Sequence, residues 1–213
     1  NWLKWALLVL TTALLSFDCS PPRRALEPTQ PPYLLKKSNW ADSVLSQLTL
    51  REKIGQLFMV AAYSNRDASH LKELEVLVRE QHIGGLIFFQ GGPVRQAKMT
   101  NHLQEIAKVP LWLGMDAEWG LGMRLDSTIS YPRQMALGAI QDPKYVYDFG
   151  KEMARQLKRL GVHVSFSPVV DINSNPKNPV IGNRSFGSSK DQVIKLGLAY
   201  MKGLQDHGVM ANA

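Results

Sequence analysis

The sequence is poor in the residues that build stapled or metal-bound folds. Its single cysteine, Cys19, among 213 residues permits no disulfide within the chain and no zinc site built from cysteines. No two histidines have the spacing of metal ligands, and nothing in the sequence indicates a cofactor, so we expect neither. No basic run is interleaved with aromatic residues, although the net charge is +7, which argues against a nucleic-acid partner. With 45% hydrophobic and 20% charged residues, the chain can bury a sizeable core, as a globular protein does.

Residues 1–20 have the pattern of a targeting segment. Lys4 precedes an apolar run that is too short for a membrane span of about 20 residues. Cys19 follows at the position of the lipid acceptor in bacterial lipoproteins, but Asp18 stands where such signals carry a small residue. Two alternatives stay open, a lipoprotein signal with a lipid anchor at Cys19 and an ordinary secretory signal. Both predict export to the bacterial periplasm or outer cell envelope, and because Asn1 is not Met we expect the sequence to begin inside the signal.

A proline-rich linker is predicted at residues 21–38. The pairs Pro21-Pro22 and Pro31-Pro32 favour extended backbone and remove hydrogen-bond donors. We therefore predict one folded part, at residues 39–213. It is shorter than the roughly 250 residues of a closed (β/α)₈ barrel.

The folded part alternates apolar segments with segments of helical periodicity. Four helices are predicted where apolar residues recur every three or four positions, at residues 67–82, 93–106, 142–160 and 189–204. Asp142 and Ser189 are predicted to cap the last two helices, and Gly161 and Gly208 to end them. Short apolar runs predict five strands, at residues 57–62, 86–89, 111–115, 162–170 and 209–211. Strands that alternate with helices form a parallel sheet with right-handed crossovers.

A parallel sheet of this kind is either open, as in a dinucleotide-binding fold, or closed into a barrel. The open alternative requires a Gly-x-Gly-x-x-Gly turn between a strand and a helix. Gly120 and Gly122 follow the third predicted strand, but the final glycine is missing and residues 127–132 have the composition of a loop. The sequence therefore disfavours dinucleotide binding.

Polar residues follow two of the predicted strands, where ligands bind in both architectures. Asp116 directly follows an apolar run, so its carboxylate is expected to accept hydrogen bonds or to face a cation. The alternative is a structural carboxylate tied to a backbone N–H or an arginine. Glu118 lies two residues on, but paired acids alone are weak grounds for a catalytic role. Asp171 lies in an Asp-Ile-Asn-Ser-Asn-Pro segment, whose composition is typical of a turn.

Arg184 lies in a long loop rich in glycine and proline at the same end of the sheet. Its planar guanidinium suits hydroxyls, amide carbonyls and carboxylates. The alternative is a structural arginine that bridges two loops. Among the histidines, His163 lies in an apolar strand and is expected in the core, whereas the other four are expected at the surface.

Three ordered motifs carry a family resemblance. Residues 114–125 (GMDAEWGLGMRL), 167–172 (SPVVDI) and 180–187 (VIGNRSFG) together resemble the N-terminal barrel of family 3 glycoside hydrolases, most closely its bacterial β-N-acetylglucosaminidase branch. Residues 48–57 (LTLREKIGQL) resemble the opening of that domain. The resemblance implies an α/β fold of the (β/α)₈ TIM-barrel type, of which only about the first five β/α units are present.

The resemblance also implies roles for three side chains. Asp116 would hold sugar hydroxyls, Arg124 would help to close the same subsite, and Arg184 would reach the N-acetylglucosamine ring. Trp119 departs from the family pattern, since many members have glycine there, and it is expected to reshape the rim of the site.

The implied activity is hydrolysis of terminal β-linked N-acetylhexosamine, from peptidoglycan fragments or chitooligosaccharides, by a retaining mechanism. In this family the nucleophilic aspartate lies on a late strand, and the branch carries a His-Asp acid/base pair after strand five, so both are expected beyond Ala213. We therefore expect the chain alone to be inactive and poorly stable. Two alternatives stay open, a β-glucosidase of the same family and a non-catalytic sugar-binding protein of the cell envelope.

Overall fold

A computed structural model describes residues 38–213. The predicted signal and nearly all of the predicted linker lie outside the described residues. The chain divides into two units between Asp42 and Ser43, a point that lies within helix α3 (Asn39–Ser46). The larger unit, residues 43–213, holds the whole of the sheet.

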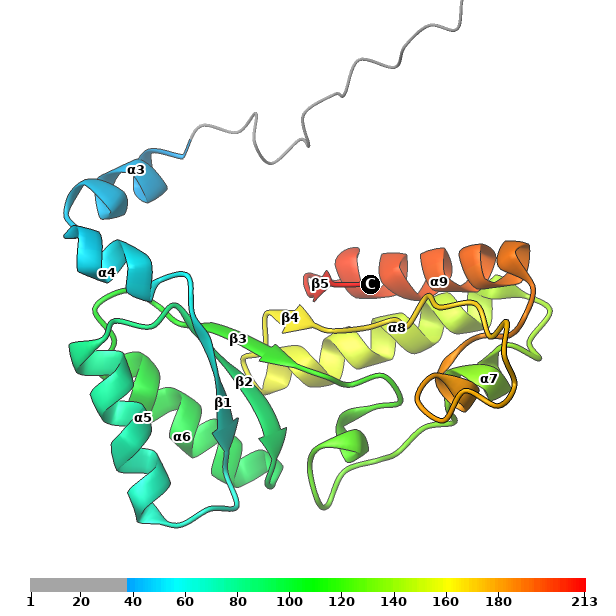
Figure 1. Cartoon of the computed structure of the whole chain (residues 1–213), viewed down its shortest axis with the longest axis horizontal. Helices are drawn as coiled ribbons and strands as arrows, with labels where there is room; N and C mark the ends of the chain where they lie inside the picture. Colours follow the sequence, from blue (N-terminus) through cyan, green and yellow to red (C-terminus); the bar gives the residue numbers. More distant parts are fainter. Residues whose placement is uncertain (1–37) are drawn as a thin grey trace, which may run out of the picture. The chain divides into compact units, whose positions relative to one another are not determined.

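That unit contains a parallel sheet of five strands in the order β1-β2-β3-β4-β5 (Figure 1). The strands are β1 (Met59–Tyr63), β2 (Gly85–Gln90), β3 (Trp112–Met115), β4 (Val164–Ser165) and β5 (Met210–Ala211). The helices between successive strands are α5 (Ala68–Glu80), α6 (Pro93–Ile106), α8 (Pro143–Arg159) and α9 (Lys190–Gln205). Shorter helices are α4 (Leu50–Gly55), α7 (Gln134–Leu137), η1 (Leu121–Met123) and η2 (Gly182–Arg184).

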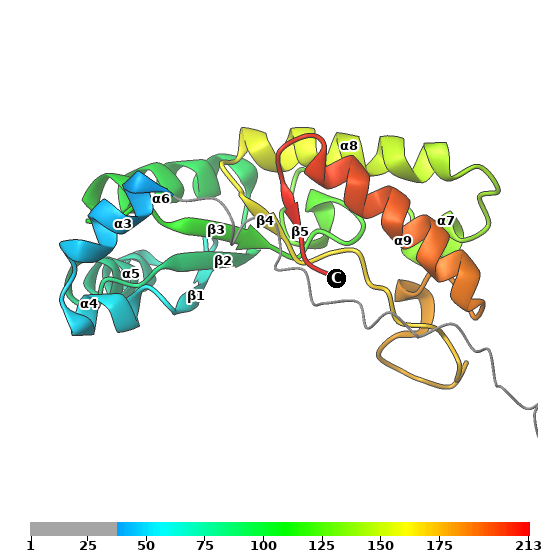
Figure 2. The same ribbon diagram turned by 90° about the horizontal axis from the view of Figure 1, so that it is seen from above.

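The helices pack against one face of this sheet. Leu86 and Phe88 of β2 are fully buried in one apolar cluster with side chains of α5, α6, α8 and α9. Ile87 and Phe89 point to the other face, because strand side chains alternate, and they are only half-buried. An open doubly wound sheet carries helices on both faces, whereas a barrel carries them on the outside alone. The unit is therefore the first part of a (β/α)₈ barrel, as predicted, and the successive strands are visible from above in Figure 2.

The predicted helix ends agree with the structure in all but one case. Asp142 caps α8 by accepting a hydrogen bond from the Lys144 N–H at 2.9 Å. Gly161 and Gly208 follow α8 and α9 with φ of 71° and 82°, a left-handed conformation that glycine adopts without a steric penalty. The exception is Ser189, which occupies the first capping position of α9 but makes no capping hydrogen bond with its side chain.

The fourth strand is much shorter than predicted. Residues 162–170 were expected to form it, but only Val164–Ser165 pair with neighbouring strands. Pro168 has no N–H to donate. At Val169 the side-chain amide of Gln134 takes the place of a partner strand, since it accepts from the Val169 N–H at 3.0 Å and donates to the Val169 C=O at 2.7 Å. The chain beyond β4 is thus held by a side chain from α7.

Two histidine predictions were wrong. His163 is exposed rather than in the core, and its Nδ1 accepts a hydrogen bond from the Leu113 N–H at 3.0 Å. His70 is buried rather than at the surface, because its Nε2 accepts from the Tyr63 N–H at 3.1 Å and so joins α5 to the end of β1. Each ring replaces a missing backbone acceptor at one end of a strand.

The described residues offer neither a metal-binding cluster nor a membrane-spanning helix. Within residues 38–213, no group of three or more His, Cys, Asp or Glu side chains is placed to hold a metal ion. Within the same part of the chain, each helix is too short or too polar to cross a membrane.

Glu52 joins the start of α4 to Lys108, which lies just after the end of α6. Thr49 and Glu52 form a capping box, in which the Thr49 N–H donates to Glu52 Oε2 at 2.7 Å. Glu52 Oε1 accepts from Lys108 Nζ at 2.5 Å. The hydrogen bond from Lys108, followed by that from the Thr49 backbone, lowers the pKa of Glu52 from 4.5 to about 2. The ionised carboxylate is therefore the form that the fold favours.

We predict that the stabilising effect of Glu52 depends on pH. Because its pKa is lower in the folded chain than in the unfolded chain, the stabilisation is fully present above pH 4.5 and is lost as the pH falls towards 2. The melting temperature of the wild type should exceed that of Glu52→Gln at pH 6, and the difference should shrink as the pH is lowered through this window. A difference that stays constant with pH would contradict this linkage.

Candidate functional site

A cavity of about 550 Å³ opens at the carboxyl ends of β3, β4 and β5. Thirteen residues line it: Asp116, Glu118, Trp119, Met123, Arg124, Phe166, Pro168, Val169, Val170, Asp171, Arg184, Asn212 and Ala213. Asp116 directly follows β3, and Asn212 directly follows β5. Because parallel strands end at the same edge of the sheet, residues nearly 100 positions apart in sequence meet in this cavity.

Asp116 and Arg124 form an ion pair inside the cavity. The Arg124 Nη2 donates to Asp116 Oδ2, and the side chains of Arg124 and Asp116 are 20% and 22% exposed. The Arg124 guanidinium also lies 4.8 Å from the centre of the Phe89 ring at the end of β2. The turn of η1 brings Arg124 back towards β3, as its N–H donates to the Leu121 C=O at 2.9 Å. Arg124 Nε is buried and has no hydrogen-bond partner among the described residues.

Glu118 and Arg184 form a second pair, which joins the loop after β3 to the loop after β4. Arg184 donates from Nε to Glu118 Oε2 at 2.9 Å and from Nη2 to Oε1 at 2.6 Å. These hydrogen bonds raise the pKa of Arg184. Glu118 is only 4% exposed, whereas Arg184 is 30% exposed. One edge of the guanidinium is therefore committed to a carboxylate, which is the loop-bridging role that the sequence left open.

A buried hydroxyl network supports the backbone of Glu118. The Tyr200 hydroxyl on α9 lies 3.3 Å from the Ala117 C=O and 3.4 Å from the Glu118 C=O. The Ser167 Oγ lies 3.4 Å from the same hydroxyl. Burial raises the pKa of Tyr200, so its hydroxyl stays neutral and can donate. This network holds the backbone of the loop that carries both Asp116 and Glu118 against α9.

Trp119 also lines the cavity and is half-buried. The guanidinium carbon of Arg133 is 4.4 Å from the centre of its ring. Arg133 Nη1 also donates to Asn183 Oδ1 at 2.9 Å, so a second bridge between the same two loops runs beside the Glu118–Arg184 pair. Arg133 and Asn183 are both exposed.

The structure thus brings Asp116, Arg124 and Arg184 into one cavity, as the sequence predicted. Whether they bind a sugar stays a prediction. Asp171 was interpreted as part of a turn, but it also lines the cavity, and its C=O accepts from the Ser185 Oγ at 2.5 Å. Phe166 and Asn212 line the cavity without having been predicted as site residues. Asn212 directly follows the predicted strand 209–211, so its position was an available signal, whereas Phe166 follows the observed β4 but lies inside the longer strand that the sequence predicted.

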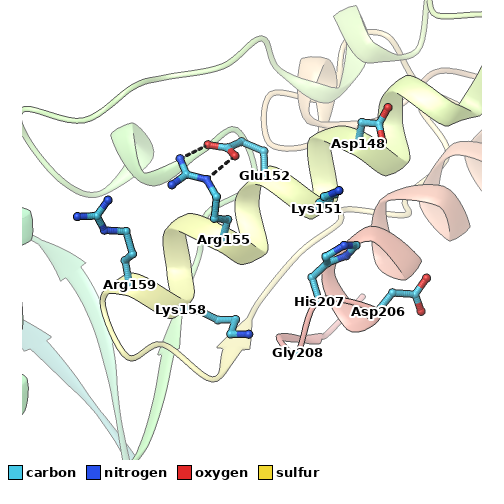
Figure 3. A pocket seen from close by; sticks show the side chains of 9 residues that line it. All are labelled: Asp148, Lys151, Glu152, Arg155, Lys158, Arg159, Asp206, His207 and Gly208. Atoms are coloured by element: carbon cyan, nitrogen blue, oxygen red, sulfur yellow. Dashed lines mark hydrogen bonds and ion pairs between the residues drawn. The ribbon is translucent and has the colours of Figure 1, made fainter.

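A larger hollow, of about 1000 Å³, lies on the outer surface of α8 and the end of α9 (Figure 3). It is lined by charged side chains of both signs, among them the Glu152–Arg155 pair, whose two hydrogen bonds are each 2.7 Å. Its residues come from α8 and from the end of α9 rather than from the carboxyl ends of the strands. A solvated helix face explains these charges, so the smaller cavity is the candidate site.

Comparisons with known proteins identify the family of the chain. The family model described as "Glycosyl hydrolase family 3 N terminal domain" matches residues 49–213. The protein named Beta-hexosaminidase LpqI of Mycobacterium tuberculosis is 32% identical over 195 residues, which cover 89% of this chain and 45% of LpqI. The Beta-N-acetylglucosaminidase/beta-glucosidase of Cellulomonas fimi is 30% identical over 174 residues, which cover 82% of this chain and 30% of that protein.

A solved structure of the same family is also similar to this chain. The glycoside hydrolase family 3 beta-N-acetylglucosaminidase from Paenibacillus sp. str. FPU-7 is 37% identical and superimposes with a TM-score of 0.68, over 77% of this chain and 32% of that chain. The chain thus spans less than half the length of each of these three relatives.

Proposed function

The chain belongs to glycosyl hydrolase family 3 through its N-terminal domain, and from this we propose that the full-length protein hydrolyses terminal β-linked N-acetylhexosamine residues. The substrates we propose are peptidoglycan fragments or chitooligosaccharides. The observation that carries the proposal is the meeting of Asp116, Arg124 and Arg184 in one cavity at the strand ends. The names of the relatives from M. tuberculosis, C. fimi and Paenibacillus support the N-acetylhexosamine part.

We assign binding and orientation of the sugar to the residues of the cavity. The Asp116 carboxylate has one oxygen on Arg124 and a second oxygen to accept from a sugar hydroxyl. The Arg124 pairing orients that carboxylate, and hydrogen bonds that involve charged groups are stronger than neutral ones. On Arg184, the edge that carries Nη1 makes no hydrogen bond to Glu118 and donates a long one, of 3.4 Å, to the Val180 C=O. This edge is the one we propose to reach the N-acetyl group.

The proposed mechanism is retaining. It requires a carboxylate nucleophile that forms a covalent glycosyl-enzyme and an acid/base group that first protonates the leaving oxygen and then activates water. The family resemblance assigns both to segments that follow the fifth strand. We therefore propose that residues 38–213 bind the sugar without cleaving it.

An assay of the full-length protein with an aryl N-acetyl-β-glucosaminide and the matching aryl β-glucoside tests the proposal. We expect cleavage of the N-acetyl substrate. Cleavage of the glucoside alone would identify the β-glucosidase alternative. The name of the C. fimi relative includes both activities, so this alternative is tested directly. Binding of N-acetylglucosamine without any turnover would identify the non-catalytic alternative. The 213-residue chain, assayed in parallel, is expected to release no product.

Export to the bacterial periplasm or outer envelope is proposed from residues 1–20 alone, which lie outside the described residues. The lipid anchor at Cys19 rests on the same segment. The mass of the mature N-terminal peptide distinguishes a cleaved and acylated Cys19 from an ordinary cleavage.

A further inference from the structure

Trp119 lines the cavity and is held in place, although it has no role in the proposed binding of the terminal sugar. Its indole ring is fixed on one face by the Arg133 guanidinium, 4.4 Å from the ring centre. Arg133 is itself held by Asn183 Oδ1 at 2.9 Å. The Trp119 C=O accepts from the Tyr131 N–H at 2.8 Å, which fixes the backbone as well. The residue is thus held through both its ring and its backbone while it lines the cavity.

The backbone after Trp119 turns tightly at Gly120. Gly120 has φ of 99°, and a Cβ atom there would lie 2.7 Å from the Tyr131 ring. Only glycine fits this close approach in the left-handed region. An aromatic side chain that is held in this way loses little conformational entropy when a ligand covers it.

We take the strand ends as the floor of the cavity and the loop side, where Trp119 lies, as its mouth. Asp116 immediately follows β3, whereas Trp119 is three residues further along the loop and its two supporting partners, Arg133 and Asn183, are exposed. A terminal sugar held by Asp116 and Arg124 would occupy the floor. The next sugar of the chain would then leave through the mouth, beside Trp119.

We infer that Trp119 forms an aromatic platform for the second sugar of the substrate, the one joined to the terminal N-acetylhexosamine. The inference rests on the proposed function, because it takes the floor of the cavity as the place of the terminal sugar. A β-linked pyranose presents axial C–H groups on its faces, and such an apolar face packs on the large surface of an indole. Trp119 is therefore a residue that determines specificity, selecting a saccharide over a small leaving group.

Binding to the full-length protein tests this inference with two probes. The first is N-acetylglucosamine, and the second is N,N′-diacetylchitobiose with sulfur in its glycosidic bond, which resists hydrolysis. For Trp119→Leu we expect the Kd of the disaccharide to rise about tenfold and that of the monosaccharide to change by less than about twofold. Trp119→Phe keeps an aromatic ring and should recover most of the loss. Trp112→Leu is the matched control, because Trp112 is a half-exposed tryptophan at the opposite end of β3.

The outcomes separate this inference from the proposed function. Equal losses of affinity for both sugars in Trp119→Leu, or no loss of affinity for the disaccharide, would overturn the platform and leave the proposed hydrolysis standing. Disaccharide binding that depends on Trp119 in a protein that cleaves no N-acetyl-β-glucosaminide would keep the platform and overturn the hydrolysis. A wild type that binds neither sugar and cleaves no aryl N-acetyl-β-glucosaminide would overturn both.

Discussion

The variant Asp116→Asn of the full-length protein is expected to lose about 10- to 150-fold in kcat/KM for an aryl N-acetyl-β-glucosaminide. The substitution keeps the shape of the side chain but removes the negative charge that faces Arg124. A hydrogen bond to a charged group contributes about 1.5–3 kcal/mol, and the loss follows from that range. Arg124 is 20% exposed, so water compensates only in part for the missing charge.

The matched control for this experiment is Asp126→Asn. Asp126 also pairs with an arginine, Arg95, but both side chains are more than half exposed and lie outside the residues that line the cavity. An exposed pair of this kind contributes about 0–1 kcal/mol, and it lies away from the proposed sugar site. The kcat/KM of Asp126→Asn should therefore stay within about threefold of the wild-type value. A loss for Asp116→Asn that is no larger than for Asp126→Asn would remove Asp116 from the proposed sugar site.

The variant Glu118→Gln is expected to lower the free energy of unfolding by about 2–3 kcal/mol. Glu118 is 4% exposed and accepts hydrogen bonds from two nitrogens of Arg184. Removal of one partner of a buried pair costs about 3–5 kcal/mol, and we lower this range because Arg184 is 30% exposed. Urea denaturation of the full-length protein measures the change. The loop that carries Arg184 should also lose its fixed position, so weaker binding of N-acetylglucosamine is expected.

Glu152→Gln provides the control for this second prediction. Glu152 also accepts two hydrogen bonds from one arginine, Arg155, each at 2.7 Å, but the pair lies on the exposed face of α8, and Arg155 is 59% exposed. Its substitution should change the free energy of unfolding by less than about 1 kcal/mol. Similar losses for both glutamates would mean that burial does not distinguish the two pairs.

The sequence predicted the positions of the helices better than it predicted which residues pair between strands. Apolar periodicity located α5, α6, α8 and α9, since each helix must bury one stripe whatever its neighbours are. The extent of β4 was wrong because the apolar character of residues 162–170 reports burial rather than hydrogen bonding. Gln134, about 35 positions earlier, supplies the bonds that a neighbouring strand was expected to make.

In the candidate site, too, local sequence signals identified the residues but not the contacts between distant segments. Asp116 was predicted from its place after an apolar strand, and Arg124 and Arg184 came from ordered motifs that resemble one family. The Glu118–Arg184 pair spans 66 positions, and nothing local to either residue indicates the other. The two alternatives for Arg184, ligand contact and loop bridge, were therefore left open by the sequence, and the structure shows the bridge.

The sequence by itself determined the α/β alternation, the family and the side chains to examine, because periodicity and motifs are properties of neighbouring residues. Only the tertiary structure decided that helices cover one face of the sheet, that each of Arg124 and Arg184 faces its own carboxylate, and that Arg133 holds the Trp119 ring. These are contacts between segments that the sequence separates. They form because parallel strands bring successive loops to one edge of the sheet.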